Sequence, residues 1–186
     1  MKHRLMLIIV TVFILLVICN ISIPQTSSEI YTNKKYGISF NIPKGMKMYT
    51  VENPGPLSTL FSKGTLLKLV NPDFTDENID VSVSGKSRVT DSDIRKTKSY
   101  LDSNPNLPMP GYRRVSVNFI KTGKQKDKMA VEHIYLMKGN ISGKLRQVAF
   151  SYRGRGFFIT CGTAVDRFDE ANQQFFDTIF NSIIFE

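Results

Sequence analysis

Apolar and polar positions alternate along several short stretches of this chain. Between Tyr36 and Pro43, polar residues separate Ile38, Phe40 and Ile42, and residues 79–83 repeat the alternation. Successive side chains of a β-strand point to opposite faces, so both stretches predict strands with one buried face. Further strand-like runs cover residues 46–51 and 65–70, and four more, separated by short turns that favour an antiparallel meander, cover residues 112–120, 128–137, 144–152 and 156–164.

A different period marks two predicted helices. Near the C-terminus, most of the apolar positions recur at intervals of three and four residues, which places them on one face of a helix. Asp166 is positioned to cap this helix. A shorter helix is predicted over Ser92–Leu101, with Asp91 as its cap. The apolar face of the C-terminal helix comprises Phe168, Ala171, Phe175, Phe176, Ile179, Phe180 and Ile183.

These elements predict an α+β fold. Strands grouped together, with helices at their edges, favour an antiparallel sheet that is covered by helices. The C-terminal amphipathic helix needs an apolar surface against its stripe, and one face of the sheet is the simplest such surface. Residues 31–186 have the length of one domain and show no internal repeat.

The first 23 residues have the pattern of an export or anchoring segment. Lys2, His3 and Arg4 precede the run Leu5–Cys19, which is apolar apart from Thr11. A charged start before an apolar core is typical of a signal peptide, and the run falls just short of the length that a spanning helix needs. A cleaved signal peptide and an uncleaved membrane anchor therefore both stay open. Residues 24–30 are expected to form a linker to the domain.

The charge around this segment predicts where the domain works. Positive residues before the apolar run favour an N-terminus inside the cell. We therefore expect a cell-membrane protein with a single pass and with residues 31–186 outside the cytoplasm; a secreted or lipid-anchored form is the alternative. Cys19 is the candidate lipidation residue, because Leu16–Cys19 resembles a bacterial lipoprotein box, although Ile18 is larger than the residue that usually precedes the cysteine.

Two stretches resemble PsbP-like domains. In Tyr31–Gly45, a Tyr-Gly pair leads into a strand that ends in proline, as at the start of these domains. Phe158–Ala164, together with the helix face that follows and Asn181–Ile183, is similar to the final strand and helix of the family. The resemblance implies an α/β/α sandwich around a central antiparallel sheet. It also implies an accessory protein that acts by binding, of the type found among bacterial lipoproteins.

Few residues offer catalytic or metal chemistry. The chain has two cysteines and two histidines, which makes a zinc site with several such ligands nearly impossible, and we expect no cofactor or metal. Cys161 alone follows the leader, so the domain has no internal disulfide, and it is interpreted as a small core residue. An extracytoplasmic enzyme that uses His133 and Cys161 is the alternative function. An acidic cluster, interpreted as a solvated turn, comprises Asp73, Asp76, Glu77 and Asp80.

The charge of the chain is the more informative feature. The formal net charge is +9, and Lys and Arg crowd residues 113–155, where only Asp127 and Glu132 oppose them. A basic rim on the meander would attract polyanions: anionic lipid headgroups, envelope polymers or an acidic protein, whereas nucleic acid is not expected outside a cell. We therefore predict a membrane-anchored, non-catalytic binding protein. The predicted rim comprises Arg113, Arg114, Lys144, Arg146, Arg153 and Arg155.

Overall fold

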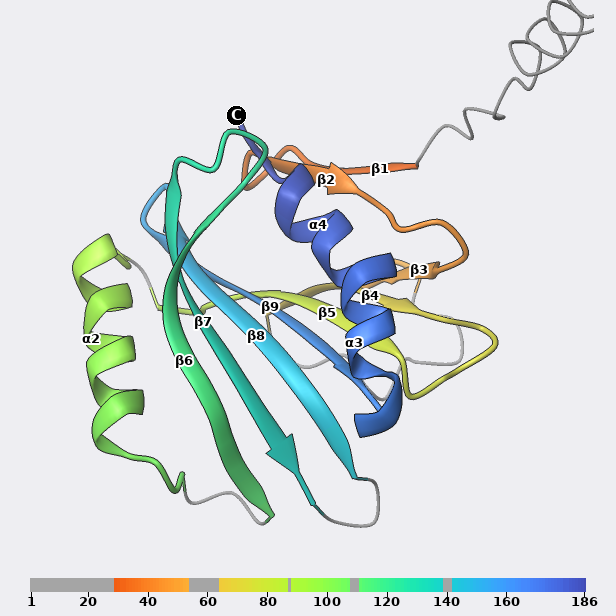
Figure 1. Ribbon diagram of the computed structural model, residues 1–186. Helices are drawn as coiled ribbons and strands as arrows, with labels where there is room; N and C mark the ends of the chain where they lie inside the picture. Colours follow the sequence, from red (N-terminus) through yellow and green to blue (C-terminus); the bar gives the residue numbers. More distant parts are fainter. Residues whose placement is uncertain (1–28, 54–63, 87, 108–110, 139–141) are drawn as a thin grey trace, which may run out of the picture.

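The computed structural model describes residues 29–53, 64–86, 88–107, 111–138 and 142–186 (Figure 1). Within these ranges the largest element is a seven-stranded antiparallel sheet with the order β3-β4-β5-β9-β8-β7-β6. Its strands are β3 (Lys47–Thr50), β4 (Thr65–Val70), β5 (Asn78–Val83), β6 (Tyr112–Thr122), β7 (Lys128–Met137), β8 (Gly143–Tyr152) and β9 (Arg155–Thr163).

The four longest strands form the predicted antiparallel meander. Strands β6 to β9 follow one another in the chain and lie side by side in the sheet. Ala130 pairs with Phe150, and Phe150 pairs with Phe157, so three strands place apolar residues in one row. Consecutive turns of a meander lie at opposite ends of the sheet. The turns after β6 and β8 therefore share one end, and the connection after β7 lies at the other.

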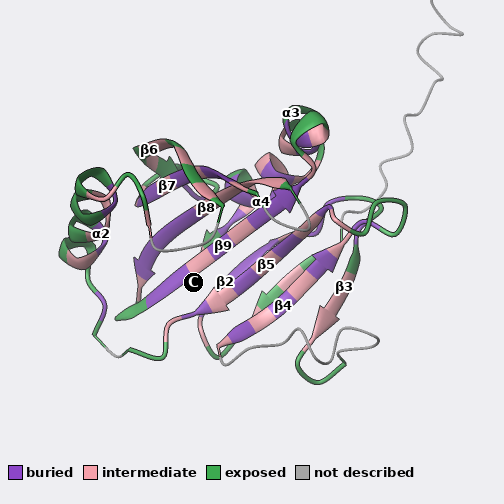
Figure 2. Ribbon diagram, turned by 90° about the horizontal axis from the view of Figure 1, so that it is seen from below, coloured by how far each residue is buried: buried purple, intermediate pink, exposed green. Residues whose placement is uncertain are grey.

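Helices cover both faces of the sheet, which confirms the predicted α+β sandwich (Figures 1 and 2). On one face, Leu67, Val81 and Ile159 pack with the C-terminal helix in the main core. On the other face, α2 (Asp91–Ser103) lies against β6, β7 and β8, where Ile94 packs on Val131. The burial of β4 and β5 alternates along each strand, as expected for strands with one buried face (Figure 2).

Helix α2 begins one residue before the expected start, with a different cap. Thr90 is the N-cap: its hydroxyl accepts a hydrogen bond from the backbone N–H of Asp93, and the Asp93 carboxylate accepts one from the backbone N–H of Thr90. This reciprocal capping box satisfies two backbone donors that the helix itself leaves open. The prediction that Asp91 caps the helix was therefore wrong. Asp91 is the first helical residue, and its carboxylate pairs with Ser151 and Lys128 instead.

The C-terminal helix contains a π turn that its sequence did not predict. It consists of a 3₁₀ turn η2 (Val165–Arg167), α3 (Phe168–Ala171), a π segment η3 (Asn172–Phe176) and α4 (Asp177–Ser182). The wider turn lets Ala171 and Phe176, five positions apart, both face the sheet. Phe175, predicted on the buried face, is only half-buried. The predicted cap Asp166 was also wrong, since it is exposed and makes no capping hydrogen bond.

A small second sheet lies beside the C-terminal helix. It has the order β1-β2-β10 and comprises β1 (Ile30–Asn33), β2 (Ile38–Asn41) and β10 (Ile184–Phe185). β2 is the first strand that the alternation predicted, and Ile38 and Phe40 enter the main core. β1 begins inside the stretch that was expected to be linker.

The acidic cluster is not the solvated turn that we expected. The carboxylate of Asp76 accepts hydrogen bonds from the guanidinium of Arg167 and, at 3.0 Å, from the backbone N–H of Ala164. Glu77 is buried, and Asp80 forms an ion pair with Lys68. Of the four acids, only Asp73 is exposed. Asp76 therefore joins the turn after β4 to the start of the C-terminal helix.

The predicted leader, residues 1–23, and Cys19 within it lie outside the described residues. So do residues 24–28 of the predicted linker. In the described part of the chain, no helix combines the length and the apolar character that crossing a membrane would need.

Candidate functional site: a basic end of the sheet

One end of the large sheet gathers Lys and Arg side chains from four separate segments. The turns after β6 and β8 lie here, together with the β1–β2 turn and the connection from β5 to α2. The β5–α2 connection contacts the β8–β9 turn through the hydrogen bond from Val89 N–H to the carbonyl of Gly154. The β1–β2 turn contacts it through Gly37, which lies beside Arg153. Three of the segments bring two cations each, and the β6–β7 segment brings four. We call this surface the basic end; its cations are Lys34, Lys35, Lys86, Arg88, Lys121, Lys124, Lys126, Lys128, Arg153 and Arg155.

Most of these cations have no acidic partner. Lys128 pairs with Asp91 at 3.2 Å, and Arg153 donates to the carbonyl of Glu186. The other eight make no ion pair with any described residue. The acids at this end are Asp91, Asp93, Asp127 and Glu186. The basic end therefore carries a net positive charge that is open to solvent.

Three cations of the basic end hold an unfavourable backbone conformation. Arg88, Lys126 and Arg153 have φ angles of 62°, 51° and 46°, and they are the non-glycine residues with positive φ in the described chain. Asparagine and glycine adopt this left-handed conformation more readily than Lys or Arg. Arg153 and Gly154 both have positive φ in the two-residue turn between β8 and β9, where Asn-Gly is the favoured pair. Strained residues of this kind cluster at functional sites, so their coincidence here marks this end as the candidate site.

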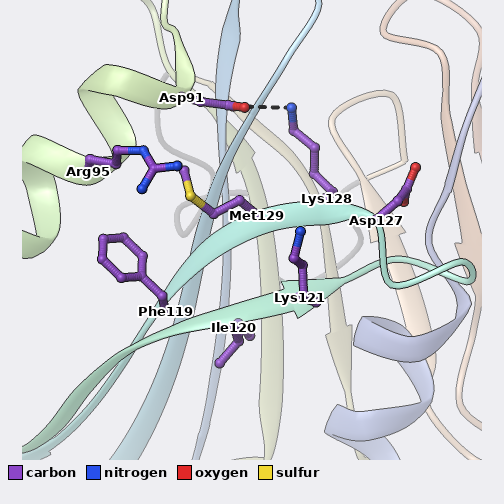
Figure 3. A pocket seen from close by; sticks show the side chains of 8 residues that line it. All are labelled: Asp91, Arg95, Phe119, Ile120, Lys121, Asp127, Lys128 and Met129. Carbon is purple, nitrogen blue, oxygen red and sulfur yellow. Dashed lines mark hydrogen bonds and ion pairs between the residues drawn. The ribbon is translucent and has the colours of Figure 1, made fainter.

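A groove of about 490 Å³ opens beside the basic end, between α2 and the β6–β7 hairpin (Figure 3). Asp91 and Arg95 of α2 form one wall, and Lys121 and Lys128 form the other. The guanidinium of Arg95 lies 5.8 Å from the ring centre of Phe119, which is 46% exposed. The groove thus combines apolar surface with cations. Asp91, in its wall, accepts a hydrogen bond from Ser151 and lies near Lys128, and both interactions lower the pKa of its carboxyl group.

Two smaller hollows indent the same end. One, of about 400 Å³, is lined by Lys124, Asp127, Ile184 and Phe185, among others. The other, of about 160 Å³, lies between Lys35, Arg153 and Arg155, with Tyr36, Tyr152 and Phe157 as its aromatic walls. The cations therefore line several shallow depressions. The cations are thus spread over three depressions of the described surface, an arrangement that can contact an extended anionic partner.

The structure divides the predicted basic rim between two ends of the sheet. Arg153 and Arg155 belong to the basic end, whereas Arg113 and Lys144 lie toward the opposite end. Arg114 donates to the carbonyl oxygens of Leu101 and Asp102 at the end of α2.

Two members of the predicted rim are held in internal ion pairs. Lys144 pairs with Asp169 at 3.6 Å. The Arg146 guanidinium donates to Glu132 and Asp177, each at 2.7 Å. The predicted rim also left out four lysines of the crowded stretch, Lys121, Lys124, Lys126 and Lys128. Lys34, Lys35, Lys86 and Arg88 were missed as well, because only the topology brings them to this end.

His133 and Cys161 project from opposite faces of the sheet. His133 pairs in register with Gln147, which pairs with Thr160, whereas the neighbour of Cys161 on β8 is Arg146. Cys161 lies in the main core under the C-terminal helix, where burial raises the pKa of its thiol. A nucleophile and its base must lie within hydrogen-bond reach of each other. The alternative of an enzyme that uses this pair is therefore wrong, and Cys161 is the core residue that its apolar strand predicted.

His133 belongs to an aromatic cluster on the α2 face. Its Nε2 lies 2.7 Å from the hydroxyl of Tyr112, and its ring stacks on Tyr135 with 4.6 Å between ring centres. Burial, and then the positive charge of Arg114, lower the pKa of His133 from 6.5. Within the described residues, no three His, Cys, Asp or Glu side chains are placed to hold a metal ion.

The lowered pKa of His133 predicts a pH-dependent loss of stability. The unfolded chain takes up the proton near pH 6.5, but the folded chain takes it up only at a lower pH. The contribution is therefore complete above pH 6.5 and is lost as the pH falls toward the folded-state value. Denaturant unfolding at pH 7.5 and pH 5.0 measures this loss. In His133→Gln, which keeps a partner for Tyr112, the loss should be smaller, and an unchanged loss would assign it to other groups.

Comparison with solved structures identifies the fold. The solution structure of cyanobacterial PsbP (CyanoP) from Synechocystis sp. PCC 6803 matches 89% of this chain and 96% of its own, with a TM-score of 0.57 and 18% identity. A crystal structure from Bacteroides thetaiotaomicron VPI-5482 matches 86% of this chain, with a TM-score of 0.58 and 10% identity; the match spans only 48% of that protein. The predicted PsbP-like fold is therefore confirmed.

A more distant match is LpqN of Mycobacterium tuberculosis, which is involved in cell envelope biogenesis. It has a TM-score of 0.48 and 11% identity, over 86% of each chain. No family model matches the sequence, and no curated protein matches it either.

Proposed function

We propose that this chain is an extracytoplasmic, non-catalytic accessory protein that is tethered to the cell membrane and binds an anionic partner through its basic end. The observation that carries the proposal is the gathering of unpaired Lys and Arg side chains from four segments at one end of the sheet. Like charges that are brought together repel one another, and an anionic partner would relieve this repulsion. The partner is a lipid headgroup, an envelope polymer or an acidic protein.

Three further features support this function. The charged start and the apolar run of residues 1–23 favour export, with the domain outside the cytoplasm. The PsbP-like fold belongs to a superfamily whose members act mainly by binding. The shallow hollows of the basic end offer cations and aromatic surfaces and, among the described residues that line them, no histidine or cysteine. The arrangement suits recognition of repeated negative charges.

The backbone of the basic end allows a sharp test of this function. Replacing Arg88, Lys126 and Arg153 by asparagine removes three charges and places at each site a residue that accepts positive φ. The triple variant is therefore expected to be at least as stable as the parent chain. Its affinity for long-chain polyphosphate should fall, and the slope of log affinity against log salt should decrease by about 2–3. Titrations of the full-length chain at several salt concentrations measure both quantities.

A matched control removes the same charge elsewhere. Lys47, Arg113 and Lys138 are exposed on other parts of the domain, and their triple replacement by glutamine lowers the net charge equally. This control should keep the parent slope and most of the affinity. If both triple variants lose the same affinity, the chain binds polyanions through its overall charge, and the basic end is not a site.

A further inference from the structure

The basic end faces the same side of the molecule as the entry of the chain. The first described residue, Glu29, leads into β1, which runs into the turn that carries Lys34 and Lys35. β1 spans only Ile30–Asn33, so about 13 Å separate the entry of the chain from the basic end. In Figure 1, β1, the β6–β7 turn and the C-terminus all lie along the upper side of the molecule.

The sequence leaves only a short connection between this entry and the predicted membrane segment. Residues 24–28 separate the end of the apolar segment from Glu29. Even fully extended, this stretch reaches about 17 Å. A domain tethered in this way stays beside the bilayer, and charges attract one another over about 8 Å at physiological salt. The bilayer is therefore the anionic surface that the basic end meets first.

Exposed apolar side chains stand among the cations. Ile184 is 42% exposed in the hollow that also contains Lys124, and Phe185 lies beside it. Ile30, at the entry of β1 and outside this group of cations, is 62% exposed. Cations interleaved with apolar side chains match the boundary between lipid headgroups and acyl chains. Cations spread over four segments can also contact a broad surface such as a bilayer at the same time, whereas a small ligand would reach only a few of them.

We infer that the basic end docks onto anionic phospholipid headgroups of the bilayer that carries the N-terminal segment. The inference rests on the proposed function and names its partner. Docking fixes the orientation of the domain: the groove beside α2 lies near the membrane surface. The opposite end, with the exposed acids Asp166, Asp169 and Glu170, points away from it.

Lysine footprinting on the full-length chain tests the docking. The protein is reconstituted in nanodiscs of phosphatidylcholine alone, or with 30 mol% phosphatidylglycerol, and is treated with an acylating reagent. Anionic discs should slow the acylation of Lys124 and Lys126 by about threefold, whereas Lys138 at the opposite end should react equally in both discs. High salt should remove the protection.

The control variants separate this inference from the proposed function. The Arg88→Asn/Lys126→Asn/Arg153→Asn chain should lose the protection of Lys124, and the matched glutamine variant should keep it. Equal labelling of Lys124 in the two kinds of disc would overturn the docking. If the same chain still bound polyphosphate through the basic end, the proposed function would stand with a different partner. If it bound neither, both proposals would fall.

Discussion

Replacing Phe176 by alanine is expected to lower the free energy of unfolding by about 3–5 kcal/mol, the range for deleting a fully buried aromatic side chain. Phe176 is 0% exposed and lies on the π segment, where its ring meets Phe168 at 6.0 Å between centres. The sheet on one side and the helix on the other limit how far neighbouring atoms can move into the gap. Domains of this size have a total stability of about 5–15 kcal/mol, so the variant should unfold at much lower denaturant concentration.

The control for Phe176→Ala is a phenylalanine of similar chemistry outside the core. Phe119 is 46% exposed on β6, and Phe119→Ala should cost well under about 1 kcal/mol. Denaturant titrations followed by circular dichroism measure both variants. A similar loss in the two variants would mean that the contact between the C-terminal helix and the sheet does not dominate the stability of the domain.

Replacing Arg146 by methionine is the second large effect, with an expected loss of about 3 kcal/mol. The Arg146 guanidinium lies between β8 and the C-terminal helix and donates to Glu132 and Asp177, each at 2.7 Å, and to Asn172. Its side chain is 13% exposed and that of Glu132 is 12% exposed. Without Arg146, the carboxylate of Glu132 stays in a low-dielectric environment with no positive partner, and this uncompensated charge causes the loss.

A second substitution identifies the cause of this loss. Glu132→Leu removes the stranded carboxylate, so Arg146→Met/Glu132→Leu should recover most of the stability that Arg146→Met loses. Arg113→Met, on an exposed position of β6, should change stability by about 0.5 kcal/mol or less. Unfolding free energies from urea titrations decide the outcome. A double variant no more stable than Arg146→Met would show that packing against the ring of Phe180, not charge, is what Arg146 contributes.

The sequence predicted the strands well because a strand with one buried face shows alternating apolar and polar residues. β4 and β7 occupy the predicted residues, and β5 differs by one residue. The capping of α2 was misassigned by one residue, because Thr90 and Asp91 are both good caps and only the backbone geometry separates them. The π turn was missed because a 3.6-residue period cannot reveal an inserted residue. Only the structure shows that Ala171 and Phe176, five positions apart, are both buried on the same face of the helix.

The sequence indicated a basic surface but not which end of the sheet carries it. Crowded Lys and Arg residues between 113 and 155 indicated a basic surface, yet consecutive hairpin turns lie at opposite ends of a meander. The turns after β6 and β8 therefore lie at one end of the sheet, away from Arg113, Lys144 and Arg146. The order of the turns along the sequence could have predicted this separation. The contribution of Lys34, Lys35, Lys86 and Arg88 needed the tertiary arrangement, because those segments are distant in sequence from the meander.

The pairing of β2 with β10 constrains how the polypeptide matures during synthesis. Ile38 pairs with Phe185 and Ser39 with Ile184, so β2 gains this neighbour only after residues 184 and 185 have been made. Contacts of such long sequence separation form late and slow the acquisition of native structure. All strands of the large sheet precede β10 in the chain, so they are made before β2 can gain this neighbour. The small sheet is therefore the last part of the described fold to gain all of its strands.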